Sequence, residues 1–428
     1  MSITRTLYSS ATRSGSGTLT RLIPTTFDAR SMPGPLAGVK VLDLTTVVMG
    51  PFATQILAEL GADVIKVETH EGDNMRDVGP MHNRGMGHLY LHLNRGKRSI
   101  VLDLKKPEGL EAVMRLLPTM DVLVYNVRPA AMARLGLSYE AVRAVNPKII
   151  YVGTYGYSQR GPNAKKAAYD DLIQGATGLS WLGSQDGDVA PRYAPVNLAD
   201  RVTGLHAVYA VTAALFHRER TGHGQSVEVP MFESIAQFVL GDHMAGMSWE
   251  PPIGGTGYAR LRHRRPYATK DGYLCVLVYN DKQWKSFLEA VGRQDLLTDE
   301  RFFPHGNRAK HIGEIYDFLD GLLRTRTTAE WTALLDRADV PVSPMNTVAD
   351  VVTDPHLVAS GFFSAEEHPT EGRLRVPRTP TDWSESKPDK VAPSGRLGEH
   401  SAQVLREAGY SEEEIAELAR KGVTLLAR

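Results

Sequence analysis

The first part of the chain alternates between short apolar runs and longer segments whose apolar positions recur at helical spacing. The run at 38–44 predicts a buried strand, the segment 51–60 a helix that begins at Pro51, and the run at 62–68 a second strand. Three further apolar runs predict strands, with helical patterns between them: SIVLDL, DVLVYN and KIIYVGTYG. Strands that alternate with helices across short turns indicate a parallel sheet covered by helices, so we expect an α/β core.

The pattern changes beyond residue 235, and this change predicts a second domain. We expect residues 36–235 to form a large Rossmann-like domain and residues 236–255 a linker, because the stretch EPPIGGTGYARLRHRRPYATKDG is rich in Pro, Gly and Arg. An alternating strand, GYLCVLVYN, and the helical patterns after it predict a smaller inserted α+β domain at 256–350. Residues 351–428 are expected to return to the large domain and complete it with two amphipathic helices.

Residues 1–35 differ in composition from the rest of the chain. They are rich in Ser and Thr and contain four arginines but one acid, Asp28. That composition is typical of a disordered leader or of a start site assigned too early, and it is also that of a transit peptide. The sequence therefore predicts a cytoplasmic protein, with the mitochondrial matrix as the alternative compartment.

The bulk composition excludes several classes of function. The 428 residues carry 49 basic and 49 acidic side chains, so no net positive charge favours nucleic acid or an anionic membrane as a partner. No segment reaches the roughly 18–20 apolar residues of a membrane-spanning helix. The single cysteine, Cys275, excludes an intrachain disulfide framework and a multi-cysteine metal site.

One carboxylate, Asp200, stands before an apolar helical pattern that runs from about Val202 to Phe216. An aspartate there fits an N-cap, because its side chain accepts hydrogen bonds from the free amides of the first helical turn. A carboxylate beside an apolar helix also fits a nucleophile. The local pattern leaves both interpretations open.

The first strand, loop, helix and second strand have the outline of a dinucleotide site, with Glu68 at the end of the second strand. A dinucleotide pyrophosphate needs close approach to the backbone, and hence several glycines in the turn. The turn here, TTVVMGPFAT, contains Gly50 alone. An NAD-dependent oxidoreductase is therefore a weak alternative.

A longer series of motifs has a specific counterpart. From residue 36 to the C-terminus the chain contains, in order, GVKVLDLTTVVMGPFATQILAELGADVIKVE, NRGKRSIVLDLKKPEG, YNVRPAAMARLGLSYE, AAYDDLIQGATGL, NLAD, ERTGHGQSVEV, DVPVSP, DPHLVASGFF, HPTEGRLRVP and LGEHSAQVLREAGYS. This series resembles the class III CoA-transferase family, the CaiB/BaiF-type group that includes carnitine, bile-acid, formyl and succinyl CoA-transferases.

The resemblance implies an interlocked homodimer of two-domain chains, acyl-CoA and a free carboxylic acid as substrates, and no metal or tightly bound cofactor. It also implies that Asp200 is the nucleophile, because the catalytic aspartate of the family falls on this position. Such a carboxylate would attack an acyl-CoA thioester to give an aspartyl mixed anhydride, and then an aspartyl-CoA thioester that the acceptor acid resolves.

Asp170 falls where transferases of the family often carry Asp or Glu facing the active site. The racemase branch of the same fold places a histidine there, since racemisation needs a second acid/base group. A carboxylate can position a substrate but replaces that histidine poorly, so a 2-methylacyl-CoA racemase is the alternative of lower weight.

The resemblance assigns CoA contacts to Asn126 and Arg134, and also to Lys97 and Arg98. Cations at these positions would meet the phosphates of CoA on a chain with no net charge. Several other family contacts are in doubt because this sequence has different residues at those positions, namely Thr46, Val48, Met49 and Thr69.

The family's glycine-rich lid is reduced here to Gly254, Gly255 and Gly257. Four arginines follow it in YARLRHRR, at 260, 262, 264 and 265, and Arg264 is a candidate for the acyl pocket. A solvated loop explains them as well. If one of these arginines contacts the substrate, its guanidinium can form a bidentate bond with a second carboxylate. That contact would favour a dicarboxylic acid, with a donor such as succinyl-CoA.

Overall fold

The computed structural model describes residues 34–184, 190–257, 264–388 and 391–427. The expectations for residues 1–33, Arg260 and Arg262 concern residues outside these ranges. Within them, no helix combines the length and apolar character needed to cross a membrane.

The large domain is built on six parallel strands in the order β3-β2-β1-β4-β5-β6, which confirms the predicted α/β sheet. In chain order they are β1 Lys40–Leu44, β2 Asp63–Glu68, β3 Lys97–Val101, β4 Val122–Tyr125, β5 Ile150–Tyr155 and β6 Gln225–Pro230. The order reverses between β1 and β4. In open parallel sheets, ligands bind at such a switch point, outside the carboxyl ends of the strands.

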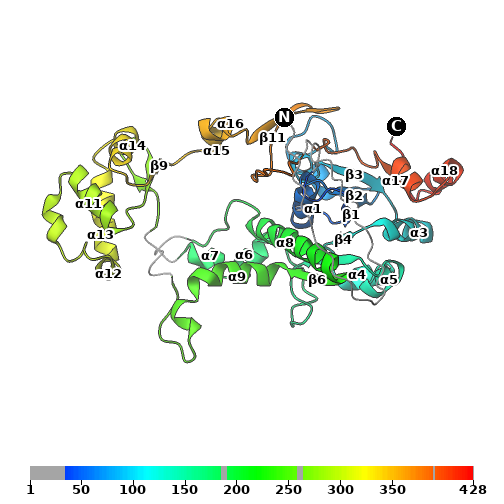
Figure 1. The fold of residues 1–428 in the computed structure, drawn as a ribbon, viewed down its shortest axis with the longest axis horizontal. Coiled ribbons are helices and arrows are strands. Elements are labelled where there is room, and N and C mark those ends of the chain that lie inside the picture. The colour runs from blue at the N-terminus through cyan, green and yellow to red at the C-terminus, as the bar shows by residue number, and fades with distance from the viewer. Residues whose placement is uncertain (1–33, 185–189, 258–263, 389–390, 428) are drawn as a thin grey trace, which may run out of the picture.

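Two layers of helices cover the sheet (Figure 1). On one face, α1 (Met49–Glu59) and α8 (Leu198–Thr221) share a core with the strands. The opposite core is formed by α3 (Pro107–Leu116), α4 (Pro129–Arg134), α5 (Tyr139–Val145), α17 (Ser401–Glu407) and α18 (Glu412–Arg420). The C-terminal helices therefore pack against the sheet formed by the N-terminal half.

Helix α8 is longer than the pattern predicted. It begins at Leu198 and ends at Thr221, before Gly222 in the left-handed conformation (φ 77°). Asn197 is the N-cap residue and Asp200 lies in the first turn, so the N-cap interpretation of Asp200 is wrong. The prediction missed the first turn because it followed the apolar run, whereas the helix carries polar residues at both ends.

Short helices connect the layers of the large domain. They are η1 (Asn74–Asp77), α2 (His88–Leu93), η2 (Leu117–Thr119), α6 (Asp170–Ala176), α7 (Leu179–Leu182), α9 (Met231–His243) and η3 (Ala245–Ser248). The second part of α9, from residue 236, and all of η3 occupy residues that the sequence pattern had assigned to a linker.

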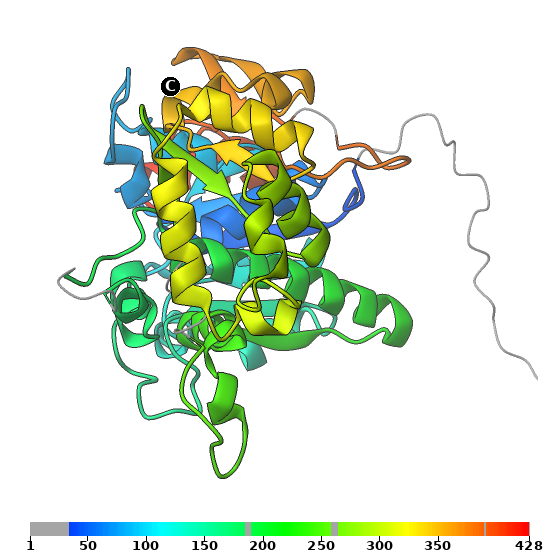
Figure 2. The ribbon, with the colours of Figure 1, turned by 90° about the vertical axis from the view of Figure 1, so that its left-hand side faces the viewer.

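A smaller unit follows, with its own core around Phe287, Leu323 and Trp331. Its strands β7 (Tyr267–Ala268), β8 (Tyr273–Val276) and β9 (Val342–Pro344) form an antiparallel sheet. Its helices are α11 (Asp281–Ala290), η4 (Gln294–Thr298), α12 (His305–Arg308), α13 (Ile312–Leu323) and α14 (Thr328–Arg337). Figure 1 shows this unit set apart at the left, and Figure 2 shows it face on.

The chain then returns along the top of Figure 1 to the large domain. This segment contains α15 (Val348–Val352), α16 (Pro355–Ala359) and an antiparallel hairpin of β10 (Phe363–His368) and β11 (Gly372–Pro377).

Candidate active site

The first turns of α8 lie against the start of α1, at the carboxyl edge of the sheet. A Cβ added to Gly204 would come within 2.9 Å of the Met49 carbonyl oxygen, so the close approach of the two helices requires a glycine there. One turn earlier, the Arg201 guanidinium lies 4.5 Å from the centre of the Phe52 ring. Asp200 is thereby brought to the edge where the loop after β1 enters α1.

Asp170 and Asp200 come together although thirty positions separate them. Asp170 is buried at the first position of α6, and its Oδ1 accepts a hydrogen bond of 2.9 Å from the Asp200 backbone N–H. Its Oδ2 accepts one of 2.5 Å from Gln174 Nε2, and Gln174 Oε1 in turn accepts the Ala194 amide at 2.9 Å. This chain of contacts fixes the segment that leads into α8, and with it the position of Asp200.

The Asp200 carboxyl is in an unfavourable place for a negative charge. Burial, and then the charge of Asp170, raise the pKa of Asp200 to about 7, while the nearby Arg201 opposes the rise. Carboxyl groups with strongly raised pKa values are concentrated at active sites. At neutral pH a large fraction of Asp200 is therefore ionised and weakly solvated, as a nucleophile requires.

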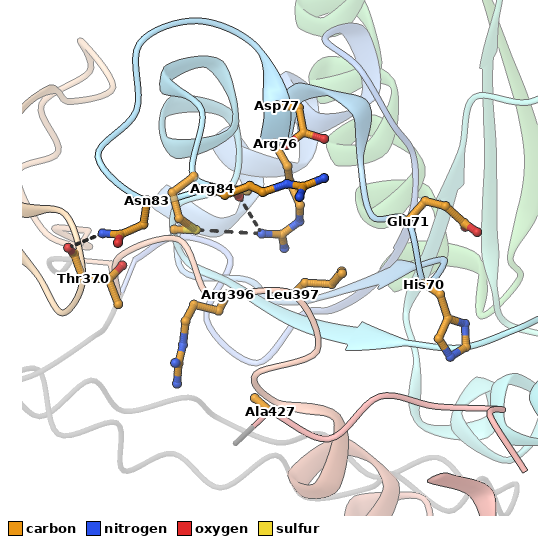
Figure 3. A pocket seen from close by; sticks show the side chains of 12 residues that line it. His70, Glu71, Arg76, Asp77, Asn83, Arg84, Thr370, Arg396, Leu397 and Ala427 are labelled. Carbon is orange, nitrogen blue, oxygen red and sulfur yellow. Dashed lines mark hydrogen bonds between the residues drawn. The ribbon is translucent and has the colours of Figure 1, made fainter. Parts of the chain in front are cut away.

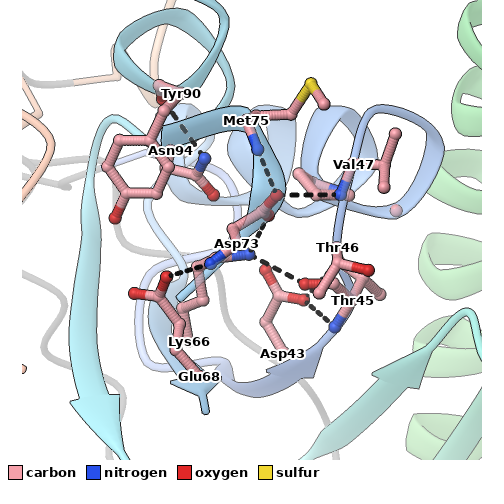
Figure 4. A network of polar contacts seen from close by, with 12 residues as sticks. Asp43, Thr45, Thr46, Val47, Lys66, Glu68, Asp73, Met75, Tyr90 and Asn94 are labelled. Atoms are coloured by element: carbon pink, nitrogen blue, oxygen red, sulfur yellow. Dashed lines mark hydrogen bonds and ion pairs between the residues drawn. The ribbon is translucent and has the colours of Figure 1, made fainter. Parts of the chain in front are cut away.

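A buried ionic network holds the loop between β1 and α1 (Figure 4). Asp43 accepts hydrogen bonds from the Thr45 amide and hydroxyl, at 2.8 and 2.5 Å. Lys66 donates to the Thr45 carbonyl at 2.8 Å and to Asp73 at 2.9 Å. Asp73 then accepts the Val47 amide at 3.1 Å. Thr45 and Val47, two residues of this loop, are thus both held by side chains of the network.

Val47 has a left-handed backbone conformation, with φ 73°. That conformation is rare for a β-branched residue and costs on the order of 1–3 kcal/mol. The bond from its amide to Asp73 offsets part of that cost. Such strained residues are concentrated at active sites and ligand clamps, and this one lies next to α1, against which Asp200 is placed.

Lys97 is part of the same network and lies in the core of the large domain. Its ammonium donates to Asp43 Oδ2 at 3.0 Å, to the Pro51 carbonyl at 2.9 Å and to Asn94 Oδ1 at 2.9 Å. These three bonds use its three donors, and 1% of the side chain is exposed. Its neighbour Arg98 pairs with Asp63 and Glu407. The Lys97 ammonium and all three guanidinium nitrogens of Arg98 thus have partners within the chain itself.

Asn126 directly follows β4, at the switch point between β1 and β4. Asn126 exchanges two hydrogen bonds with the backbone of Thr46, accepting at 3.1 Å and donating at 2.7 Å. It therefore ties the loop after β4 to the loop after β1. Arg134, in the last turn of α4, is exposed. Among the described residues no ion pair or hydrogen bond occupies its guanidinium.

The glycines of the reduced lid lie in an exposed turn after η3. Gly255 accepts a hydrogen bond from the Gly246 amide, and the Gly257 amide donates to His243. Arg264 is exposed and lines a cavity of about 680 Å³ in the small domain, together with Tyr267 and Trp284. Asp200 does not line that cavity, so one chain by itself does not unite Arg264 with the aspartate pair.

A separate cavity of about 800 Å³ lies beside the carboxyl end of β2 (Figure 3). Arg76 forms part of its wall and is paired with Glu68. Arg84 and Arg396 also line it, and Asn83 closes one side by donating to the Thr370 carbonyl at 2.8 Å. The described residues contain no group of three or more His, Cys, Asp or Glu side chains that could hold a metal ion.

Comparison with known proteins agrees with this geometry. Residues 36–401 match the model of CoA-transferase family III. The chain belongs to that family. It is 36% identical over 383 residues to the succinate–glutarate CoA-transferase of Agrobacterium fabrum, covering 87% of this chain and 95% of that one. It is 32% identical over 395 residues to human succinyl-CoA:glutarate CoA-transferase, covering 91% and 90%.

More distant relatives have the same class of activity. The chain is 31% identical over 419 residues to a formyl-CoA:oxalate CoA-transferase of Escherichia coli, covering 90% of this chain and 98% of the relative. Among solved structures, a CaiB/BaiF family protein of Brucella suis matches with a TM-score of 0.75 and 33% identity, over 88% of this chain and all of that one. These findings confirm the predicted family, and the chain is a class III CoA-transferase. Because the chain belongs to this family, the alternative of an NAD-dependent oxidoreductase no longer applies.

Sequence reasoning missed three contributors to this site. Gln174 and Asp73 act through backbone amides, and no sequence motif marks such contacts. Arg201 was overlooked because it follows Asp200 directly, and neighbouring residues on a helix do not usually face each other.

Proposed function

We propose that this enzyme transfers CoA from succinyl-CoA, or a similar donor, to a dicarboxylic acid, with Asp200 as the nucleophile. The observation that carries the proposal is the half-buried Asp200 carboxyl, held at the carboxyl edge of the sheet by the contacts of Asp170. The names of the relatives support dicarboxylic substrates.

The reaction then proceeds in four displacements. An Asp200 oxygen attacks the thioester carbonyl of the donor, and CoA thiolate leaves, giving an aspartyl mixed anhydride. The thiolate attacks the carbonyl carbon of Asp200 and releases the donor acid, leaving an aspartyl-CoA thioester. The acceptor carboxylate displaces CoA from this thioester to form a second anhydride. The thiolate finally attacks the acceptor acyl carbon, giving acceptor-CoA and free Asp200.

Each displacement passes through a tetrahedral oxyanion, which backbone amides can stabilise. The start of α1 is suited to this task, because Val48 caps it without a side-chain hydrogen bond and the amides of Met49 and Gly50 lie in its first turn, ahead of Pro51, which has no N–H. Amides and the positive end of the helix dipole are therefore presented towards the start of α8. The network of Asp43, Lys66 and Asp73 keeps these amides in place.

For CoA, we propose contacts with Asn126 and Arg134. Arg134 offers a guanidinium for a phosphate, and Asn126 holds the loop at the switch point. The internal bonds of Lys97 and Arg98 give these residues a structural role instead.

We further propose that the enzyme works as an interlocked homodimer. Large apolar side chains are exposed along α8 and α9, which a single chain leaves uncovered: Leu205, Tyr209, Phe216, Phe238 and Leu240. Apolar surface gathered in this way is typical of an interface. Sedimentation of the purified protein should give twice the mass of one chain.

A substrate panel tests the proposed reaction. Succinyl-CoA with glutarate should give glutaryl-CoA and succinate, followed by mass spectrometry. In deuterated water a chiral 2-methylacyl-CoA should keep its α-hydrogen, because both oxygens of Asp170 are engaged in hydrogen bonds. Rapid α-exchange without CoA transfer would establish the racemase alternative.

A further inference from the structure

Arg201 differs from the other arginines that are withdrawn from solvent. Arg76, Arg95, Arg98 and Arg308 each have a carboxylate partner. The Arg201 guanidinium, in contrast, has the face of Phe52 as its neighbour, and among the described residues no ion pair or hydrogen bond satisfies its five donors. The side chain of Arg201 is half-buried and still reaches solvent, so its donors are free to bind an incoming ligand.

The surroundings of Arg201 favour an anion. Burial lowers the pKa of Arg201, and the charge of Asp200 is what opposes this effect. The other titratable group close by is His92 of α2, whose pKa is lowered to about 4 by burial and then by Arg95, His88 and Arg201. His92 is therefore neutral at pH 7, so it adds no positive charge, and being a histidine it cannot supply the missing counter-ion for Arg201.

Catalysis removes the one negative charge that Arg201 has nearby. When Asp200 forms an anhydride or a thioester, it becomes neutral, and the guanidinium then lies without a counter-ion in a partly buried place. An uncompensated charge of this kind is costly, so an anionic group on the bound substrate would be attracted most strongly in the covalent intermediates.

We propose that Arg201, seated on the Phe52 ring, forms a second subsite beside Asp200 that binds the distal carboxylate of a dicarboxylic acyl group. The inference rests on the proposed function and adds a determinant of specificity to it. A succinyl group carries its second carboxylate three carbon–carbon bonds from the reacting carbonyl. Arg201 directly follows Asp200 on the same helix, so its long side chain can reach that distal carboxylate. The planar guanidinium suits a bidentate bond.

This assignment differs from the candidate that the sequence offered, Arg264. Arg264 lines a cavity of the small domain, and its guanidinium is exposed to solvent. An exposed guanidinium loses little when its ligand is absent, so it discriminates weakly between a charged and an uncharged acyl chain. Arg201, half-buried on an aromatic ring, is left with an unpaired charge by the uncharged chain.

The experiment compares two donors of equal carbon number, succinyl-CoA and butyryl-CoA. Single-turnover consumption of each donor, with enzyme in excess, is measured for wild type, Arg201→Gln and Arg201→Lys. Arg220→Gln is the matched control, because Arg220 lies in the last turn of the same helix and also lies over a phenylalanine, at 5.5 Å from the Phe216 ring.

Arg201→Gln should lower the rate with succinyl-CoA by roughly 30- to 1,000-fold and the rate with butyryl-CoA by less than about threefold. Arg201→Lys should restore part of the selectivity, and Arg220→Gln should change neither rate. Equal losses with both donors would mean that Arg201 acts through Asp200 or the fold, and would overturn the subsite. A wild type that consumes both donors equally fast would overturn the subsite but leave the transfer reaction. A wild type that consumes neither would overturn the proposed function as well.

Discussion

Two buried aspartates at the same edge of the sheet are in opposite electrostatic states. Asp43 is surrounded by donors, and although burial opposes ionisation, Lys97, Lys66 and two threonine hydroxyls lower its pKa to about 2. Asp200 has a second aspartate as its neighbour, and its pKa is raised to about 7. The paired charge of Asp43 stabilises the fold, whereas the unpaired charge of Asp200 is available for reaction. The opposite directions of the two pKa shifts distinguish the structural network around Asp43 from the reactive group, Asp200.

The strongest effect should come from Asp200→Asn. The amide is a far poorer nucleophile than the carboxylate, so we expect kcat to fall by at least about 10⁴-fold while CoA binding is kept. Coupled assays of glutaryl-CoA formation and calorimetry with CoA measure the two quantities. Activity above about a tenth of wild type would show that another group forms the covalent bond.

The same variant has a stability signature. The folded pKa of Asp200 lies above its unfolded value near 4, so the wild type bears a cost above pH 7 that disappears as the pH falls from 7 towards 4. Asp200→Asn should therefore melt at a higher temperature than wild type at pH 8, and this advantage should shrink at pH 5.

Asp43→Asn should act on stability first. It leaves the fully buried Lys97 without its ionic partner, which costs on the order of 3–5 kcal/mol. The matched control is Asp63→Asn, which removes a partner of Arg98 that is 39% exposed and should cost less than about 1 kcal/mol. Urea unfolding measures both, and an equal cost for the two variants would contradict the structural role of the network.

Arg134→Ala should weaken CoA binding without changing the fold. Loss of one charged hydrogen bond to a phosphate corresponds to about a tenfold rise in Kd. Arg143→Ala on the adjacent α5 is the control, since that side chain is also exposed. Isothermal titration with CoA distinguishes them, and equal Kd values for both variants and wild type would remove Arg134 from the proposed site.

The smallest effect concerns pH. Ionised Asp200 is the reactive form, so kcat/KM should rise with pH through an apparent pKa near 7. Asp170→Asn keeps an acceptor for the Asp200 amide but removes the neighbouring charge, and should move this midpoint to lower pH. Burial is the larger cause of the shift, so part of it should persist. An unchanged midpoint would show that Asp170 has no electrostatic effect on Asp200.

The sequence predicted five of the six strands because these are largely buried on both faces and appear as continuous apolar runs, as at Val41 and Ile65. It did not predict β6, in which more and less exposed positions alternate. Through the resemblance to a family it also singled out Asp170 and Asp200, which the structure brings together. Their catalytic roles stay a prediction.

For Lys97 the CoA contact implied by the same resemblance stays a prediction. The structure places its ammonium in the core, where Asp43, Asn94 and the Pro51 carbonyl use its donors, and a Lys-Arg pair before a strand gives no sign of such contacts. The sequence also missed the first turn of α8 and the half-buried neighbour Arg201, since packing against α1 and Phe52, and not local pattern, determines both.

Trapping of the covalent intermediate tests the nucleophile most directly. Wild type is incubated with succinyl-CoA and then with hydroxylamine, and its peptides are analysed by mass spectrometry, with Asp43 as the internal control. The contrast between the two aspartates predicts a hydroxamate at Asp200 and none at Asp43. A hydroxamate at a different residue, or unmodified Asp200 in an enzyme that transfers CoA, would contradict it.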